Sequence, residues 1–211
     1  MERKVLREPR DTTAGRIMDA ATQVFADVGF AGARVDEIAR RAGVNKATIY
    51  YHVGDKAALY ARVLHDVLGD TAARIARTIG PEQGPEEKLK TYIRGISDAI
   101  SRHPSIPSIM MRELASGGLH LPNVVAEDMR QVLAVISDIL DEGVRKGVFT
   151  RSNPALVHLM VIGAVVLSRL AEAMVARHES LRESVTIFPQ GAGDTVIAEA
   201  ERLVLRALRP Q

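Results

Sequence analysis

The chain has 211 residues, 46% of them hydrophobic, which is enough for one small and one large folded domain with a real core. It contains no cysteine, and this excludes a disulfide framework, a thiolate nucleophile and a cysteine-based zinc site. Its formal net charge of +2 is too small for a nonspecific architectural nucleic-acid binder. Few aromatic residues and many Ala, Leu, Val and Arg residues predict an all-α protein.

The positive charge is concentrated at the start of the chain. Residues 1–56 hold ten Lys and Arg against eight Asp and Glu, which accounts for the whole net charge. Arg3, Lys4, Arg7 and Arg10 form a basic arm, and such an arm either reaches phosphates or a minor groove or remains a solvated tail. No apolar segment follows these charges, so we expect no secretory signal and a cytoplasmic protein.

The first predicted helix covers residues 11–28, with apolar side chains at helical spacing. In the shorter helix that follows, Asp36 and Glu37 complement the helix dipole of the first turn. Gly43 ends this helix, because glycine adopts the left-handed conformation, and Asn45 is placed to cap the next helix, residues 46–52. Two short helices joined by a glycine-containing turn predict a helix-turn-helix whose second helix enters the major groove of DNA.

The sequence VDEIARRAGVNKATIYYHVGDKAALY resembles the N-terminal domain of the TetR-type transcriptional regulators. The resemblance covers residues 17–60, with two departures. Arg34 stands where a Ser or Thr often caps the helix against a phosphate, and Val53 stands where an aromatic residue is usual. The resemblance implies a sequence-specific transcriptional regulator, by default a repressor, which binds a palindromic double-stranded operator and is released by a small-molecule effector.

Five residues are expected to bind the DNA backbone. Lys46 and Lys56 are placed to neutralise phosphates, and Thr48 and Tyr51 offer hydroxyls near the edge of the groove. By similarity to the family, Tyr51 and Lys56 match positions that clamp the backbone. Arg34 is expected to replace the usual capping hydroxyl with an ionic contact.

Other residues of the second motif helix are expected near the bases. By similarity to the family, Ala47, Thr48 and Tyr50 match positions that face base edges or thymine methyl groups. For Asn45, a contact with the DNA backbone and a contact with a base are the two alternatives. For Tyr50, the alternative is packing in the protein core, because aromatic residues at helical spacing often pack there.

The rest of the chain reads as a larger helical domain, residues 55–211, after a DNA-binding domain of residues 1–54. Asp55 is placed to cap a long connector helix that runs to about residue 79. Further helices are predicted near residues 86–102, 105–115, 123–146, 154–177 and 193–208. The expected fold is therefore all-α with about nine helices: a three-helix DNA-binding domain and a C-terminal domain that the resemblance assigns to ligand sensing and dimerisation.

Residues 103–120 interrupt the helices repeatedly and include two methionines, whose flexible thioethers suit an adaptable apolar pocket. In the family this region borders the ligand cavity, so we predict that it forms a wall of the effector pocket. The alternative is ordinary core packing of the methionines, with Arg112 and Glu113 as a structural pair. The candidate pocket residues are His103, Met110, Met111, Arg112 and His120.

The helix predicted at residues 154–177 is apolar on nearly every side over residues 156–170, which is more than one buried face requires. The resemblance implies that the last two helices pair with their twofold mates in a homodimer, and a core helix of a monomer is the alternative. The longest apolar run, residues 159–167, is too short for a membrane span, so we expect a buried helix. The expected interface residues are Leu159, Ile162, Val166, Leu170 and Leu203.

No arrangement of residues supports catalysis. The six histidines include no HExxH motif, and the sequence GAGD at residues 191–194 lacks the third glycine of a dinucleotide-binding loop. No P-loop and no G-x-S-x-G motif occurs. We therefore expect no enzyme activity, no metal and no cofactor, with an enzyme and a nonspecific DNA-binding protein as the alternatives to a specific regulator.

Overall fold

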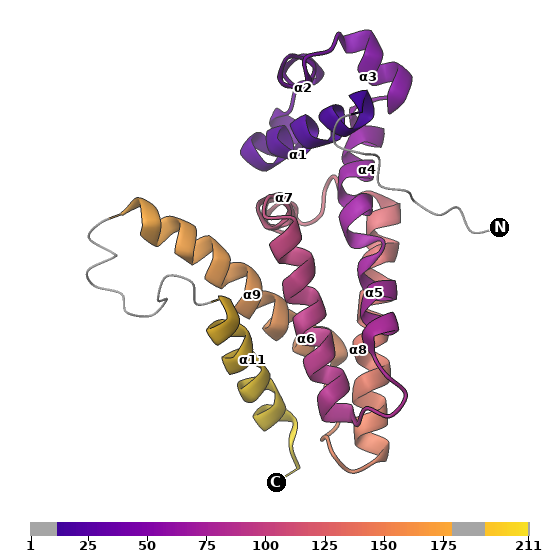
Figure 1. Cartoon of the computed structure of the whole chain (residues 1–211), viewed down its shortest axis with the longest axis vertical. Helices are drawn as coiled ribbons and strands as arrows, with labels where there is room; N and C mark the ends of the chain where they lie inside the picture. Colours follow the sequence, from indigo (N-terminus) through magenta and orange to yellow (C-terminus); the bar gives the residue numbers. More distant parts are fainter. Residues whose placement is uncertain (1–11, 179–192, 211) are drawn as a thin grey trace, which may run out of the picture. The chain divides into compact units, whose positions relative to one another are not determined.

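The protein is described here by a computed structural model that covers residues 12–178 and 193–210. Within these ranges the chain forms helices and no strand, as its composition predicts (Figure 1). The basic arm of residues 1–10 and part of the GAGD segment lie outside the described residues.

Most helices begin and end within two residues of their predicted bounds. The N-terminal motif and its flanks are α1 (Thr13–Gly32), α2 (Val35–Ala42), α3 (Lys46–His52) and α4 (Lys56–Leu68). The remaining helices are α5 (Thr71–Thr78), α6 (Pro85–Arg102), α7 (Ile106–Ala115), α8 (Asn123–Arg145), α9 (Pro154–Arg177) and α11 (Gly193–Leu208).

The predicted connector over residues 55–79 is not one helix, and this expectation was wrong. Helix α4 ends at Leu68 and α5 begins at Thr71, so Gly69 and Asp70 interrupt it. Asp is a poor helix former, and a side chain on Gly69 would meet the preceding turn, because its Cβ would lie 2.7 Å from Cε1 of His65. A Gly-Asp pair can signal a break in a helix. Apolar residues recur at helical spacing on both sides of this pair, so the sequence pattern favoured one continuous helix.

The chain divides into two compact units, and the division falls at this break. The first unit comprises the described residues up to Asp70 together with His103–Arg130. The second unit comprises Thr71–Arg102 and the described residues from Gln131 onward. Helix α7 therefore belongs to the same unit as the helix-turn-helix.

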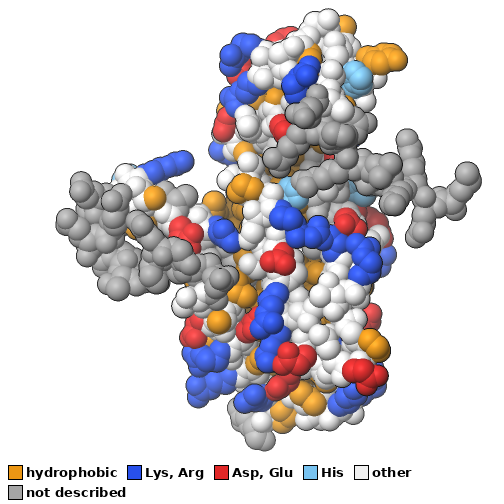
Figure 2. All heavy atoms as spheres, viewed as in Figure 1, with side chains coloured by type: hydrophobic (Ala, Val, Ile, Leu, Met, Phe, Trp, Pro, Cys, Tyr) orange, Lys and Arg blue, Asp and Glu red, His pale blue; other side chains and the backbone are white. Residues whose placement is uncertain are grey.

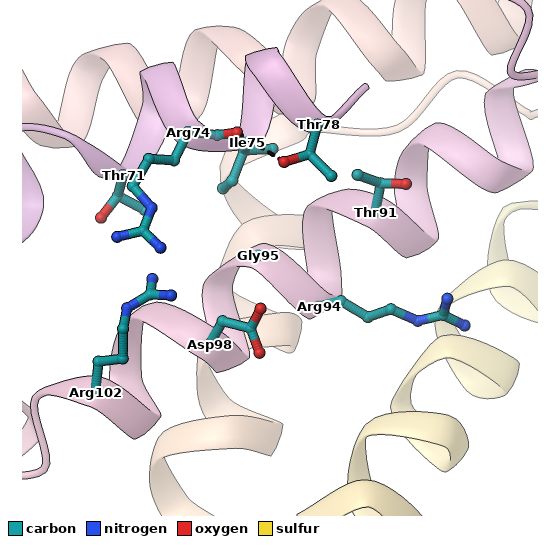
Figure 3. A pocket seen from close by; sticks show the side chains of 9 residues that line it. All are labelled: Thr71, Arg74, Ile75, Thr78, Thr91, Arg94, Gly95, Asp98 and Arg102. Atoms are coloured by element: carbon teal, nitrogen blue, oxygen red, sulfur yellow. Dashed lines mark hydrogen bonds between the residues drawn. The ribbon is translucent and has the colours of Figure 1, made fainter. Parts of the chain in front are cut away.

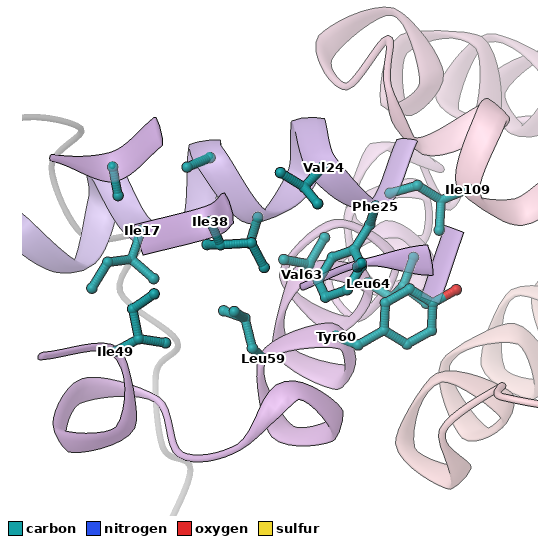
Figure 4. Packing of buried hydrophobic residues seen from close by; sticks show 14 of the residues in the cluster. Ile17, Val24, Phe25, Ile38, Ile49, Leu59, Tyr60, Val63, Leu64 and Ile109 are labelled. Carbon is teal, nitrogen blue, oxygen red and sulfur yellow. The ribbon is translucent and has the colours of Figure 1, made fainter. Parts of the chain in front are cut away.

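The core of the first unit lies where α1, α2, α3 and α4 meet. Ile17, Ile38, Ile49 and Leu59 come from these four helices, point toward one another and have no exposed surface (Figure 4). Burying a side chain of this size contributes about 1.5–3 kcal/mol to folding. Ile109 of α7 joins the same cluster, so α7 is packed onto the DNA-binding module.

The core of the second unit is formed by α5, α6, α8, α9 and α11 around buried Leu89, Ile93 and Val161. A polar pair lies within it: the Tyr92 hydroxyl and Nδ1 of His158 are 2.6 Å apart and satisfy each other. Burial lowers the pKa of His158 and therefore favours the neutral ring.

Helix α9 is less buried than expected. With 24 residues, α9 is long and apolar enough to cross a membrane by length and composition alone. The uninterrupted apolar run at residues 159–167 had predicted a helix too short for a membrane span. Only 24% of its most apolar stretch is buried in the protein. One row of large side chains faces outward, and its members are Leu156, Leu159, Met160, Leu167 and Met174.

Candidate nucleic-acid interface

The turn between α2 and α3 is built by two local features that the sequence predicts. Gly43 has φ = 65°, so it occupies the left-handed region that closes α2 without a steric cost. Asn45 caps α3, because its Oδ1 accepts a hydrogen bond of 2.8 Å from the backbone N–H of Thr48. Together they fix the direction in which α3 leaves α2.

Helix α3 is attached to the protein through one buried residue. Ile49 has no exposed surface and contacts the core of the first unit (Figure 4). The rest of the helix carries Lys46, Ala47, Tyr50 and Tyr51 as exposed side chains, and Tyr51 is 87% exposed. A short helix with two aromatic residues in solvent presents a contact surface, because such residues otherwise bury themselves.

Two polar residues of α3, Lys46 and Thr48, have partners within the module. Nζ of Lys46 lies 3.0 Å from a carboxylate oxygen of Asp36, an exposed ion pair that a phosphate could replace at little cost. The Thr48 hydroxyl donates to Oδ1 of Asn45 at 2.8 Å. Asn45 therefore has a structural role in this state, and its amide NH₂ group retains the capacity to donate to DNA.

Arg34 lies at the N-terminal cap of α2 but makes no capping hydrogen bond with its side chain. The side chain is exposed, which suits the ionic contact expected of it. The backbone N–H groups at the start of α2 add to the local positive potential, as they do at any helix N-terminus.

Lys56 has a structural role that sequence reasoning missed. Its ammonium donates to the carbonyl oxygens of Phe30 at 2.9 Å and Ala33 at 3.2 Å, and lies 4.4 Å from the centre of the Phe30 ring. These acceptors belong to the end of α1, 23 and 26 residues away. Two of the three ammonium hydrogens are used in this way, which leaves one for a phosphate.

A charged network on α2 was also missed. Glu37 accepts hydrogen bonds from Arg40 and Arg41, and these lower its pKa to about 2. Arg41 reaches Asp27 of α1 as well, at 2.8 Å. Their spacing of three and four residues along a helix was the available signal. Elsewhere too, Lys and Arg side chains are interleaved with Asp and Glu over the face shown in Figure 2.

The arrangement of α2, the turn and α3 agrees with comparisons to known proteins. Residues 17–63 match the family of bacterial regulatory proteins named tetR, and residues 85–178 match the tetracycline repressor-like C-terminal domain. The HTH-type transcriptional repressor SCO4008 of Streptomyces coelicolor is 32% identical over 189 residues, which cover 85% of this chain and 93% of that protein. The chain belongs to the TetR family.

Other relatives of this TetR-family chain are also transcriptional regulators. The HTH-type transcriptional repressor NicS of Pseudomonas putida is 29% identical over 158 residues, 73% of each chain. The regulator FadR of Bacillus subtilis, solved in complex with stearoyl-CoA, has the same fold, with a TM-score of 0.68 and 21% identity over 92% of this chain and 98% of that one. The protein is thus a helix-turn-helix transcriptional regulator with a TetR-type C-terminal domain.

The residues predicted for the effector pocket lie on or beside α7, in the first unit. Met110 and Met111 are half-buried, and Met110 packs against the core shared with α1. Nη2 of Arg112 donates to the carbonyl oxygen of Asp27 at 2.8 Å, and the ring of His120 lies 4.8 Å from that of Phe30. His103 is half-buried just before α7. This TetR-family segment is in direct contact with the DNA-binding module.

Glu113 of α7 is a buried carboxylate whose partners the sequence did not predict: they are Tyr60 and His120. The hydroxyl of Tyr60, on α4, donates to its Oε1 at 2.8 Å, and the backbone N–H of His120 donates to its Oε2 at 3.2 Å. Burial and this carboxylate raise the pKa of Tyr60, so its hydroxyl keeps the proton that it donates. The contact joins α7 to α4, the helix that begins directly after the helix-turn-helix.

The residues predicted for the dimer interface differ in exposure. Leu159 of α9 and Leu203 of α11 are 57% and 49% exposed, so both are available to a partner. Ile162 and Leu170 are half-buried. Val166 is 7% exposed and contributes mainly to the interior of its own chain.

Proposed function

We propose that this TetR-family regulator is a repressor that binds a roughly palindromic operator as a homodimer and dissociates when a small molecule binds. The observation that supports this proposal most directly is the exposed outer surface of α3, a helix whose one buried side chain is Ile49. SCO4008 and NicS are named as repressors, which favours repression over activation.

Contacts with DNA divide into two kinds in this proposal. Arg34, Lys46 and the remaining hydrogen of Lys56 bind phosphates and set the position of the module. Ala47, Tyr50 and the Thr48 methyl group meet base edges and thymine methyl groups in the major groove. The Tyr51 hydroxyl, on the most exposed ring of α3, reaches the backbone beside the groove.

Homodimerisation uses the outward row of α9 together with Leu203 of α11, two helices that pack side by side in the second unit (Figure 1). A second copy of the chain covers these leucines and methionines, whose exposure in a monomer is costly. His158, Arg169 and Glu172 lie on the same helix, and ionisable groups of this kind are expensive in a bilayer. A dimer in the cytoplasm therefore fits α9 better than a membrane span does.

Effector release requires that ligand binding favours a conformation unable to hold both half-sites. Helix α7 is a suitable lever, because Arg112 and Glu113 attach it to α1 and α4. Displacing α7 would disturb two of the helices on which α3 depends. Coupling is then carried by contacts inside the first unit.

The operator itself provides the test of this proposal. The purified protein is used to select duplexes from a random-sequence pool, and the selected pool is sequenced. We expect two inverted half-sites whose centres are about 34–36 Å apart, one turn of DNA, or a multiple of it. Selection by a Tyr50→Ala, Tyr51→Ala variant should not enrich the same sequence. A pool without any enriched sequence would contradict specific binding, and a single unpaired half-site would contradict the dimer.

A further inference from the structure

The last turn of α1 is set apart from the rest of that helix by Gly29. Its φ of 70° and ψ of 179° are not helical, so the chain changes direction just before Phe30. The carbonyl oxygens of Phe30 and Ala33, which follow this break, accept the two hydrogen bonds from the ammonium of Lys56, at 2.9 and 3.2 Å. The position of these acceptors therefore depends on the contacts that the last turn makes for itself.

The ring of Phe30 makes three such contacts. Nζ of Lys56 lies over this ring, 4.4 Å from its centre, where the face of the ring attracts a cation. The ring centres of His120 and Tyr60 lie 4.8 and 5.0 Å from that of Phe30, within the range of favourable aromatic pairs. The ammonium of Lys56 thus depends on Phe30, and the ring of Phe30 depends on His120 and Tyr60.

Glu113 of α7 holds both of these neighbours of Phe30. The hydroxyl of Tyr60 donates to its Oε1 at 2.8 Å, and the backbone N–H of His120 donates to its Oε2 at 3.2 Å. Nδ1 of His120 also lies 3.9 Å from Oε1. The carboxylate is buried, so these donors satisfy it inside the protein and keep the two rings in place beside Phe30.

Two glycines return the chain from α7 to this position. Gly117 and Gly118 have φ values of 71° and 76°, in the left-handed region that favours glycine. The N–H of Gly118 donates to the backbone carbonyl oxygen of Glu113 at 2.7 Å. The turn that they form leads directly to His120.

We propose that His120 is a positioning residue for DNA binding: its ring holds Phe30, and Phe30 holds the ammonium of Lys56 in place for a phosphate. An ammonium with two hydrogens committed to carbonyl oxygens directs the third one way. Without the His120 ring, Phe30 and the last turn of α1 move, and that direction is lost. His120 itself touches no DNA. This inference rests on the proposed function in one respect, because it takes Lys56 to bind a phosphate.

Acetylation of the full-length protein tests the first link without DNA. A limiting amount of N-hydroxysuccinimidyl acetate modifies lysine amines, and mass spectrometry follows each lysine in the same sample. We expect Lys56 to react about fivefold faster in His120→Ala than in the natural chain, the factor that corresponds to one weakened hydrogen bond. Lys46 is the internal control: its exposed ion pair with Asp36 does not involve Phe30, so its rate should not change.

Operator binding tests the second link, with the operator recovered by selection and anisotropy measured across a series of salt concentrations. His120→Ala should lower the dependence of log K on log salt by about 1, as expected for Lys56→Met. Added to Lys56→Met, it should cause no further decrease. Added to Lys46→Met, it should cause the same decrease as in the natural chain, because Lys46 binds its phosphate independently of His120.

Two further variants examine the ring contact itself. His120→Phe keeps an aromatic ring against Phe30 and should behave as the natural chain in both assays. Phe30→Leu keeps an apolar side chain but removes the ring face over which Lys56 lies, and should reproduce the effects of His120→Ala. Urea unfolding shows whether each variant is folded, so either His120→Ala or Phe30→Leu can decide the outcome.

Gly95→Ala is the control for a general loss of stability, because it acts in the second unit. A Cβ atom on Gly95 would lie 2.6 Å from Cγ1 of Ile75, and both residues line the groove between α5 and α6 (Figure 3). This variant should lower the urea midpoint and leave both the acetylation of Lys56 and the salt dependence unchanged.

Unchanged acetylation of Lys56 in His120→Ala and Phe30→Leu would overturn the inference, whether or not the protein binds an operator. Faster acetylation together with an unchanged salt dependence on a specific operator would also overturn it, because the phosphate contact would then not depend on His120. If acetylation changes as expected but selection recovers no operator, the proposed function fails, while the dependence of Lys56 on His120 is supported.

Discussion

Single side chains stabilise the DNA-binding module through contacts with residues that are far away in the sequence. Lys56 begins α4, yet its ammonium holds the last carbonyl groups of α1 and lies over the ring of Phe30. The family resemblance predicts that Lys56 binds a phosphate, and the structure adds contacts by which it stabilises the end of α1. Helix ends leave carbonyl groups unsatisfied, and a cation there meets both the hydrogen-bonding and the dipole requirement.

Lys56→Met tests both roles, because methionine keeps most of the side-chain length but removes the charge. We expect the free energy of unfolding, measured in urea, to fall by about 1–2 kcal/mol. The dependence of log K on log salt for operator binding should fall by about 1, as expected for one lost phosphate contact.

Lys46→Met is the matched control for stability. Its ion pair with Asp36 is exposed, so its loss should change the free energy of unfolding by less than about 0.5 kcal/mol. Equal stability of the two variants would contradict the structural role of Lys56. An unchanged salt dependence in Lys56→Met would remove this lysine from the DNA contacts.

The hydroxyl of Tyr60 and the backbone N–H of His120 both donate to the buried carboxylate of Glu113. Tyr60→Phe should lower the free energy of unfolding by about 1–3 kcal/mol, the cost of leaving a buried polar group without a partner. Tyr51→Phe removes the same atom from a ring that is 87% exposed and should change stability by less than about 0.5 kcal/mol. Similar losses in both variants would contradict the importance of the α4–α7 contact.

At the scale of helices, the sequence predicts features that depend on neighbours in the chain. Gly43, Asn45 and Asp55 act within three residues of their own positions, so helix propensity and capping rules find them. The contacts of Lys56 and Glu113 join residues 23 or more positions apart, apart from the His120 bond, and no local pattern encodes them.

The two caps can be compared directly. Asn45→Ala removes the acceptor for the N–H of Thr48 and should destabilise α3 by about 1 kcal/mol, seen as faster hydrogen exchange at Thr48. Asp55→Ala removes the corresponding acceptor for Ala58 in α4 and serves as the control. Each variant should accelerate exchange at its own helix start first. Unchanged exchange at Thr48 in Asn45→Ala would mean that the turn alone holds α3.

At the scale of the whole molecule, helix α9 carries some apolar side chains that its own chain buries and others that only a partner could bury. Its bounds were predicted from Pro154 and the length of the apolar pattern, and the structure reproduces them. The sequence could not show which apolar residues face inward: Val166 is buried within the chain while Leu159 is exposed. That distinction depends on where α6 and α11 pack against α9.

Homodimerisation through α9 can be tested with charged substitutions in its outward row. Leu159→Glu together with Leu167→Glu places charges in the outward row of α9 and should convert the protein into a 23.0 kDa monomer in sedimentation velocity. Leu119→Glu alters a leucine that is 75% exposed in the first unit and should leave the dimer intact. A natural chain that sediments only as a monomer at every concentration would contradict homodimerisation through α9.

Fluorescence anisotropy tests most directly whether α3 reads a specific DNA sequence. The purified protein is titrated against the duplex upstream of its own gene and against a scrambled duplex across a series of salt concentrations. We expect tight binding to the upstream duplex alone, and loss of this binding in the Tyr50→Ala, Tyr51→Ala variant. Equal, weak and steeply salt-dependent binding to both duplexes, unaffected by that variant, would contradict sequence-specific reading by α3.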